Sequence, residues 1–150
     1  MQKLKETAEL YRVGLISGFI NIDDVIAWAD SVIEVESSPD PGILEVSVSR
    51  NKCPEDVAHE LEKVCGICDL QVPIRQLLKL MHEAVTRDQQ KAGEIAGALR
   101  MMAQRNFVPD AEAEWKMFYL LDAFADAHYG YYSLDQAIKA IVKFLQSYAD

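Results

Sequence analysis

The sequence predicts an all-α fold of about eight helices, stacked as antiparallel hairpins in a bundle or a short α-solenoid-like array. Half of the residues are hydrophobic, and they are spread along the whole chain. In most segments they recur at i, i+3, i+4 and i+7, which is the spacing of one face of a helix. Short stretches bearing proline or glycine separate these segments. We therefore expect residues 1–150 to form a single all-helical domain, a common size for one.

Two helices are predicted in the first third of the chain. The first runs from about residue 2 to residue 12, with Gly14 as its C-cap. Asn21 has a side chain suited to capping a second helix, whose apolar positions recur over residues 25–33. Residues 34–42 hold two prolines and a glycine, so we expect a loop there.

Residues 43–49 are compatible with two interpretations. Leu44, Val46 and Val48 alternate with polar residues, as they would in a half-buried strand. A lone strand would leave its backbone hydrogen-bonding groups unpaired, because every other segment is predicted to be helical. We therefore predict a short helix here, with Pro41 near its start.

The remainder of the chain contains clearer helix starts. Pro54 is followed by two acidic residues and opens a helix, and Pro73 opens the next. A further helix is expected over residues 88–105, before an aromatic helix described below. Ser133 begins the last helix, and Gln136 lies three residues on, where it completes a capping box.

Three cysteines, Cys53, Cys65 and Cys68, make an odd count in a chain without an evident export signal, which favours reduced thiols. The CGIC segment matches a CxxC motif, but His59 is at the wrong spacing to be a fourth zinc ligand. A thioredoxin-like role would need a strand before the motif, where a helix is predicted to end. We interpret the cysteines as small buried thiols and predict no metal and no cofactor.

The formal net charge of −9 is unevenly distributed. Residues 1–60 carry a net charge of −7, residues 61–108 carry +2, and residues 109–150 carry −4. Acidic ends repel phosphate backbones, so direct binding of nucleic acid is not expected, whereas a basic protein partner is permitted. The alternative is that the excess of acid only keeps the protein dispersed in solution.

The sequence contains no apolar run near the ~20 residues of a membrane span. The N-terminal segment also lacks the apolar block and the small-residue cleavage site of a secretory signal. These features predict a cytoplasmic protein with no membrane association.

The segment of residues 114–132 holds seven of the thirteen aromatic residues and is predicted to form a helix with two distinct faces. The core-facing side gathers Met117, Leu120, Leu121 and Phe124. The opposite side aligns Trp115, Phe118, Tyr119, Asp122, Asp126 and Tyr129. This second face either packs against a neighbouring helix that supplies basic partners or is displayed to another molecule. The spacing favours packing, because aromatic residues at helical spacing usually belong to a core.

The sequence contains little that predicts catalysis. Its histidines, His59, His82 and His128, fall in no recognisable catalytic spacing, and no phosphate loop, nucleophile elbow or HExxH motif occurs. The best enzymatic candidate combines Asp122, Asp126 and His128, which could bind a divalent metal or exchange a proton. His128 is rotated by about 200° from Asp126 on an ideal helix, so we favour carboxylates in ion pairs or at an interface. We predict that the protein is not an enzyme.

Three tyrosines surround Gly130, namely Tyr129, Tyr131 and Tyr132. Tyrosine offers apolar area with a polar tip and is enriched at interfaces, which makes this cluster a candidate binding surface. The equally weighted alternative is that the tyrosines close the core at a corner between two helices.

Residues 11–49 contain three further features. These are Gly14-Leu15-Ile16-Ser17, then Val25-Ile26 with Trp28-Ala29-Asp30, and, after a proline-bearing loop, Leu44-Glu45-Val46-Ser47. The pattern resembles small helical immunity proteins of bacterial toxin–immunity systems, including those of contact-dependent growth inhibition. The resemblance implies a helical protein that binds a sibling's toxin domain in the cytoplasm and occludes its active site. Such toxins are frequently basic nucleases, in agreement with the acidic ends of this chain.

The leading hypothesis is therefore an immunity protein that covers the substrate site of one cognate toxin with an acidic and aromatic surface. The candidate contact residues on the aromatic helix and its end are Trp115, Tyr119, Asp122, Asp126, Tyr129 and Tyr131. A second acidic patch is formed by Asp23, Asp24, Asp30 and Glu34. The alternative is a helical-repeat adaptor or regulatory domain that binds another cytoplasmic protein.

Overall fold

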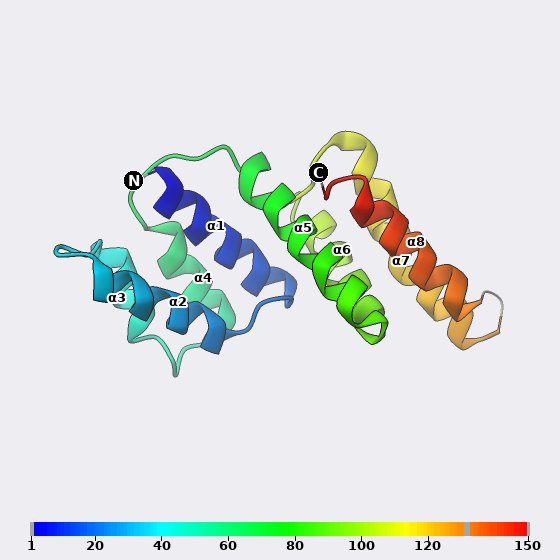
Figure 1. The fold of residues 1–150 in the computed structure, drawn as a ribbon, viewed down its shortest axis with the longest axis horizontal. Helices are drawn as coiled ribbons and strands as arrows, with labels where there is room; N and C mark the ends of the chain where they lie inside the picture. The colour runs from blue at the N-terminus through cyan, green and yellow to red at the C-terminus, as the bar shows by residue number, and fades with distance from the viewer. Residues whose placement is uncertain (1, 131–132, 150) are drawn as a thin grey trace. The chain divides into compact units, whose positions relative to one another are not determined.

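The computed structural model describes residues 2–130 and 133–149, and this part of the chain is helical and contains no strand (Figure 1). The helices are α1 (Gln2–Ser17), α2 (Ile22–Val35), α3 (Pro41–Ser47), α4 (Pro54–Glu62), α5 (Gln71–Arg87), the 3₁₀ turn η1 (Gln89–Lys91), α6 (Ala92–Gln104), α7 (Ala111–His128) and α8 (Leu134–Gln146). The predicted all-α class is confirmed. Contacts along the chain group into two compact units, residues 1–73 and residues 74–150, and each is described by itself.

In the unit of residues 1–73, α1 packs on α4, α2 packs on α3, and α3 also contacts α4. Its core is formed by Ala8, Leu15, Val25, Ala29, Ile43, Val46, Val57, Leu61 and Val64. Tyr11 of α1 stacks on Trp28 of α2, with their ring centroids 4.9 Å apart. Each short helix thus buries its apolar stripe against another, as isolated helices of this length require for stability.

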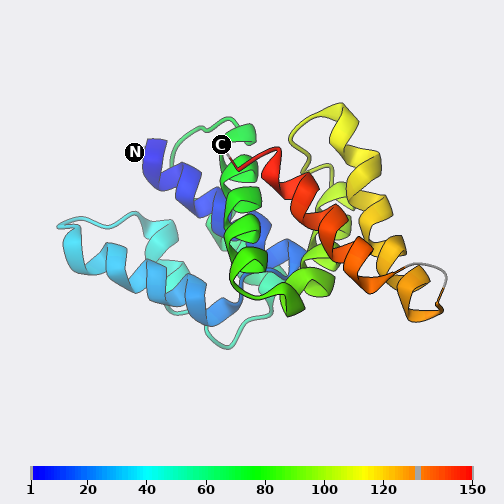
Figure 2. The same cartoon turned by 45° about the vertical axis from the view of Figure 1, so that its right-hand side comes forward.

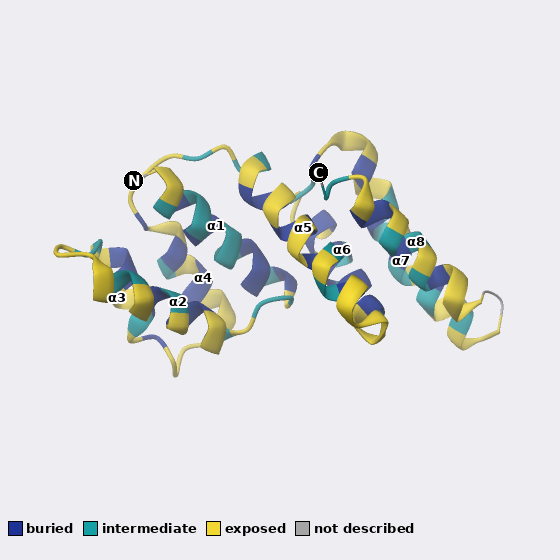
Figure 3. Cartoon of the chain, in the orientation of Figure 1, coloured by how far each residue is buried: buried dark blue, intermediate teal, exposed yellow. Residues whose placement is uncertain are grey.

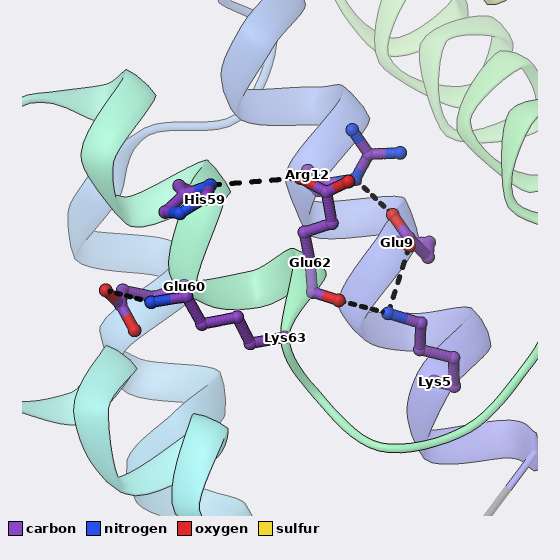
Figure 4. Close-up of polar contacts among 7 residues, drawn as sticks. All are labelled: Lys5, Glu9, Arg12, His59, Glu60, Glu62 and Lys63. Atoms are coloured by element: carbon purple, nitrogen blue, oxygen red, sulfur yellow. Dashed lines mark hydrogen bonds and ion pairs between the residues drawn. The ribbon is translucent and has the colours of Figure 1, made fainter.

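A buried polar network joins α1 to the end of α4 (Figure 4). Lys5 Nζ donates a hydrogen bond to the backbone oxygen of Glu62 at 2.7 Å and pairs with Glu9 Oε1 at 3.1 Å. Arg12 also pairs with Glu9, so this carboxylate is shared by two cations. Lys5 and Glu9 are both buried, and the additional partners compensate the cost of removing their charges from water.

The end of α1 differs from the prediction. The helix continues through Gly14 to Ser17, and Gly18, with φ of +83°, terminates it. A Cβ atom on Gly14 would lie 2.4 Å from Ile20 Cδ1, so the glycine allows the chain after the helix to fold back closely. The predicted C-cap at Gly14 is therefore wrong, because this glycine serves a close contact and Gly18 supplies the turn.

The short helix predicted over residues 43–49 is confirmed as α3. Asp40 caps it by accepting a hydrogen bond from the N–H of Gly42 at 2.8 Å, and Pro41 occupies its first turn. Ile43 and Val46 are fully buried, whereas Leu44 and Val48 are exposed. Burial in this segment therefore follows the spacing of a helix and not the alternation that a strand would show.

Asp40 also binds the loop that follows α4. Its Oδ2 accepts a hydrogen bond from the N–H of Cys65 at 3.1 Å. Burial by itself would raise the pKa of Asp40, but hydrogen bonds from the Cys65 thiol and from the N–H groups of Gly42 and Cys65 outweigh it and lower the pKa. The same contact raises the pKa of the Cys65 thiol. Cys53 and Cys65 are exposed and Cys68 is half-buried, so the interpretation of the three cysteines as buried thiols is wrong.

In the unit of residues 74–150, α7 contacts both α6 and α8, and α6 also contacts α8. The two views agree that α8, in red, runs alongside α7, in yellow and orange, in the opposite direction (Figure 2). The predicted capping box is present, since Ser133 accepts from the N–H of Gln136 while the side chain of Gln136 accepts from the N–H of Ser133. The helix predicted over residues 88–105 begins with the 3₁₀ turn η1 before α6.

Asp40 provides the first test of the fold. Asp40→Ala removes the cap of α3 and the bond to Cys65, so it should lower the free energy of unfolding by about 1 kcal/mol. Urea unfolding followed by circular dichroism measures this change, and a variant as stable as the wild type would contradict it.

Asp40→Asn is the control for charge, because asparagine caps a helix as well as aspartate does, although its NH2 group cannot accept the hydrogen bond from the N–H of Cys65. A carboxyl group with a lowered pKa contributes stability above its unfolded pKa and loses it as the pH falls through its folded pKa. We therefore expect the wild type to lose more stability than Asp40→Asn when both are acidified through that range.

Candidate functional site

The start of α7 and its buried residues determine which side chains of the helix face solvent. Asp110 caps the helix by accepting a hydrogen bond from the N–H of Ala113 at 2.8 Å, and two glutamates in the first turn favour the helix dipole. The buried residues are Ala113, Met117, Leu120 and Ala123. Because these positions face α6 and α8, the other side of α7 is left toward solvent. Buried and exposed residues alternate along the helices of this unit (Figure 3).

The outer side of α7 carries the predicted contact residues in one row, which we call the α7 stripe. It consists of Trp115, Tyr119, Asp122, Asp126 and Tyr129, at spacings of three or four residues. Trp115 is 60% exposed, Tyr119 50% and Tyr129 74%. The interpretation that this face packs into a core is therefore wrong for these side chains. Phe118, predicted to share the face, is half-buried.

The two carboxylates of the α7 stripe differ in their partners. Asp122 Oδ1 accepts a hydrogen bond from Arg100 Nη1 of α6 at 3.1 Å, and both side chains are exposed to solvent. Asp126 is exposed and has no basic group within 4.0 Å among residues 2–130 and 133–149. An exposed ion pair contributes at most about 1 kcal/mol, so a partner can displace Arg100 from Asp122 at small cost.

The C-terminal end of α7 displays Tyr129. This residue caps the helix, and its ring lies edge-on to His128 with a centroid distance of 5.4 Å. Gly130 follows with φ of +82°, a left-handed conformation that glycine adopts without strain. Tyr131 and Tyr132 lie outside the described residues, so the tyrosine cluster remains a prediction beyond Tyr129.

The second predicted patch lies on α2 and is called here the α2 acidic face. Its members Asp23, Asp24, Asp30 and Glu34 are all exposed. The described part of the chain places no lysine, arginine or histidine within 4.0 Å of these four carboxylates. The sequence contains no lysine or arginine from Val13 to Ser49. The charge of this face is therefore not neutralised by nearby groups of its own segment.

A groove between α7 and α8 adjoins one end of the α7 stripe, and no pattern in the sequence predicts it. Its volume is about 380 Å³. The groove is lined by Trp115, Lys116, Tyr119, Leu120, Ala140, Lys143, Phe144, Ser147 and Tyr148. The groove therefore combines an apolar lining with one lysine from each helix. This combination becomes visible only when the two helices are placed side by side.

Tyr148 joins the end of α8 to the start of α7. Its hydroxyl donates a hydrogen bond to Asp110 Oδ2 at 2.8 Å, and the guanidinium carbon of Arg75 lies 5.4 Å from the centre of its ring. Arg75 also donates to the backbone oxygen of Pro109 at 3.2 Å. Burial, followed by the bond to Asp110, raises the pKa of Tyr148 to about 12, and the same bond lowers the pKa of Asp110.

The described residues do not form a metal-binding site. No group of three or more histidine, cysteine, aspartate or glutamate side chains among residues 2–130 and 133–149 is arranged to hold a metal ion. Asp122, Asp126 and His128 are thus not brought together as a ligand set there. In the same residues, no helix is both long enough and apolar enough to cross a membrane.

Comparison with known proteins returned no match to a protein-family model, a curated protein or a solved structure.

Tyr148 provides a test of how the groove is held in place. Tyr148→Phe loses the hydrogen bond to Asp110 and should lower the free energy of unfolding by about 1 kcal/mol. A raised pKa means that this stability is fully present below pH 10 and is lost as the pH rises toward 12.

Absorbance titration of tyrosinate should show a step near pH 12 that is missing in Tyr148→Phe. The matched control Tyr119→Phe, on the exposed stripe, should retain that high-pH step. If the two variants give the same titration curve, the assignment of the raised pKa to Tyr148 is wrong.

Proposed function

We propose that this chain is an immunity protein without catalytic activity, which binds a cognate toxin domain through the α7 stripe and occludes the active site of that toxin. The observation that carries the proposal is the exposure of Trp115, Tyr119 and Tyr129 in one row with Asp122 and Asp126. Large aromatic side chains exposed together are uncommon on a protein without a partner and are enriched among the residues that dominate binding energy.

The arrangement of the α7 stripe suits a partner with basic and apolar groups at its binding site. The aromatic rings offer area that becomes buried on binding, and Asp126 offers a carboxylate without a partner among the described residues. Asp122 becomes available when Arg100 is displaced, since the pair is exposed. A basic nuclease domain, whose substrate site must attract phosphate, has the complementary charge.

The α2 acidic face supports the proposal through long-range electrostatics. Four carboxylates on one helix, without an ion-pair partner in the part of the chain that the structure describes and in a segment free of lysine and arginine, produce a negative field toward a basic partner. Such a field raises the association rate more than it raises the final affinity. The resemblance of residues 11–49 to small helical immunity proteins covers α2 and α3, and it supplies the functional class of the proposal.

Co-expression tests the function directly. An immunity gene should lie beside the gene of its toxin, so the chain should restore growth when it is expressed with the C-terminal domain of the neighbouring gene product. Trp115→Ala with Tyr119→Ala removes the central aromatic pair and should cost at least about 2 kcal/mol of binding free energy, enough to weaken the rescue.

The matched control is Leu134→Ala, which removes an apolar side chain, 58% exposed, from α8 outside the stripe. It should rescue growth like the wild type. Absence of rescue by the wild-type chain would contradict the immunity proposal and favour an adaptor. Equal rescue by the Trp115/Tyr119 variant would show that the toxin binds another face.

The two carboxylates of the stripe are tested by kinetics. Asp122→Asn with Asp126→Asn should slow association with the toxin domain about threefold to tenfold and reduce the salt dependence of the association rate. The measurement is surface plasmon resonance at several salt concentrations. The control Asp135→Asn with Glu112→Gln removes the same charge from exposed positions outside the stripe and should have a smaller effect. Identical rates for both double variants would contradict a specific role for Asp122 and Asp126.

A further inference from the structure

The groove between α7 and α8 has the dimensions of a small-molecule site. Its volume of about 380 Å³ lies at the lower end of the range of about 300–1,000 Å³ that such sites occupy. Leu120 and Phe144 are buried side chains that contribute to its apolar lining, together with the small side chain of Ala140. Trp115 and Tyr119 form an aromatic wall on the α7 side.

The charged groups that line the groove are two lysines. Lys143 of α8 has no carboxylate within 4.0 Å among residues 2–130 and 133–149. Lys116 of α7 lies 4.0 Å from Glu112, at the limit of an ion pair, and its Nζ is 5.8 Å from the centre of the Trp115 ring. In a chain with a net charge of −9, two lysines at one apolar groove define a local site for an anion.

Two hydroxyl groups of the groove are already engaged in hydrogen bonds within the protein. The hydroxyl of Tyr148 donates to Asp110 at 2.8 Å, and the hydroxyl of Ser147 donates to the backbone oxygen of Phe144 at 2.5 Å. Tyr148 therefore presents mainly its ring to the groove. A ligand that fits this lining needs an apolar body and one anionic head, with few other polar groups.

We propose that the α7–α8 groove binds a small amphiphilic carboxylate, with its aliphatic or aromatic body on Leu120, Ala140 and Phe144 and its head on Lys143 and Lys116. Burial of the body removes apolar surface from water, and the lysines supply charge-assisted hydrogen bonds. This binding site does not depend on the proposed function, although Trp115 and Tyr119 are shared with the α7 stripe.

Decanoate is the probe, and Trp115 is the reporter. The chain has only two tryptophans, and Trp28→Phe removes the other one while keeping an aromatic ring to stack on Tyr11. Decanoate should change the emission of Trp115 saturably, with a dissociation constant on the order of 0.1 mM. Decanol has the same body without the charge and should bind about tenfold more weakly. Equal binding of both probes would overturn the anionic site.

Two variants on α8 test the position of the charge. In the Trp28→Phe background, Lys143→Glu should weaken decanoate binding at least about tenfold. The matched control Lys139→Glu reverses a lysine on the same helix that pairs with Asp135 at 2.9 Å and does not line the groove, so its affinity should stay within about twofold. Equal effects of the two substitutions would show only a response to net charge and would overturn the proposal.

A third variant tests the apolar body. In the Trp28→Phe background, Ala140→Phe fills the groove without adding a tryptophan beside the Trp115 reporter, and it should abolish binding of decanoate and decanol alike. Circular dichroism checks that the helices are retained. A short acidic peptide provides the alternative occupant. If the peptide binds with Lys143 dependence while decanoate does not bind, the groove receives a protein segment and the small-molecule proposal is overturned.

Discussion

The apolar stripe of α8 must be covered, and this requirement determines which surfaces the unit of residues 74–150 can offer. Ala137, Ile141, Phe144 and Leu145 are buried, and α8 reaches this state by packing on α7 and α6. Since α7 also packs on α6, only one side of α7 is left for solvent. This packing produces both surfaces. The α7 stripe is the side of α7 that no helix in the described part of the unit covers, and the α7–α8 groove lies along the contact between the two helices.

Periodicity and local chemistry were sufficient to predict the helices and several of their ends. The caps at Asn21 and Ser133 depend on side chains that reach only three residues along the chain, so they can be recognised without tertiary structure. The end of α1 could not be recognised in this way. Gly14 and Gly18 are both possible C-caps in sequence, and the choice depends on the contact between Gly14 and Ile20 after the helix ends.

The candidate site could be predicted only in part, for a related reason. A helical wheel places Trp115, Tyr119 and Asp122 on one face, but it does not determine whether a second helix covers that face. The hydrogen bond between Tyr148 and Asp110 joins residues 38 positions apart. Lys116 and Lys143 line the same groove only because α7 and α8 pack side by side in opposite directions. Such combinations arise from tertiary structure and leave no periodic signal in the sequence.

The lack of lysine and arginine between Val13 and Ser49 also affects how the α2 acidic face can be studied. Trypsin has no cleavage site in this segment, so α2 and α3 leave a complete digest in one long peptide. Amine-directed cross-linkers likewise have no attachment point there. Carbodiimide coupling, which joins a carboxylate to an amine, would instead link this face only to lysines supplied from outside the segment, and a partner bound to α2 would thereby become covalently marked.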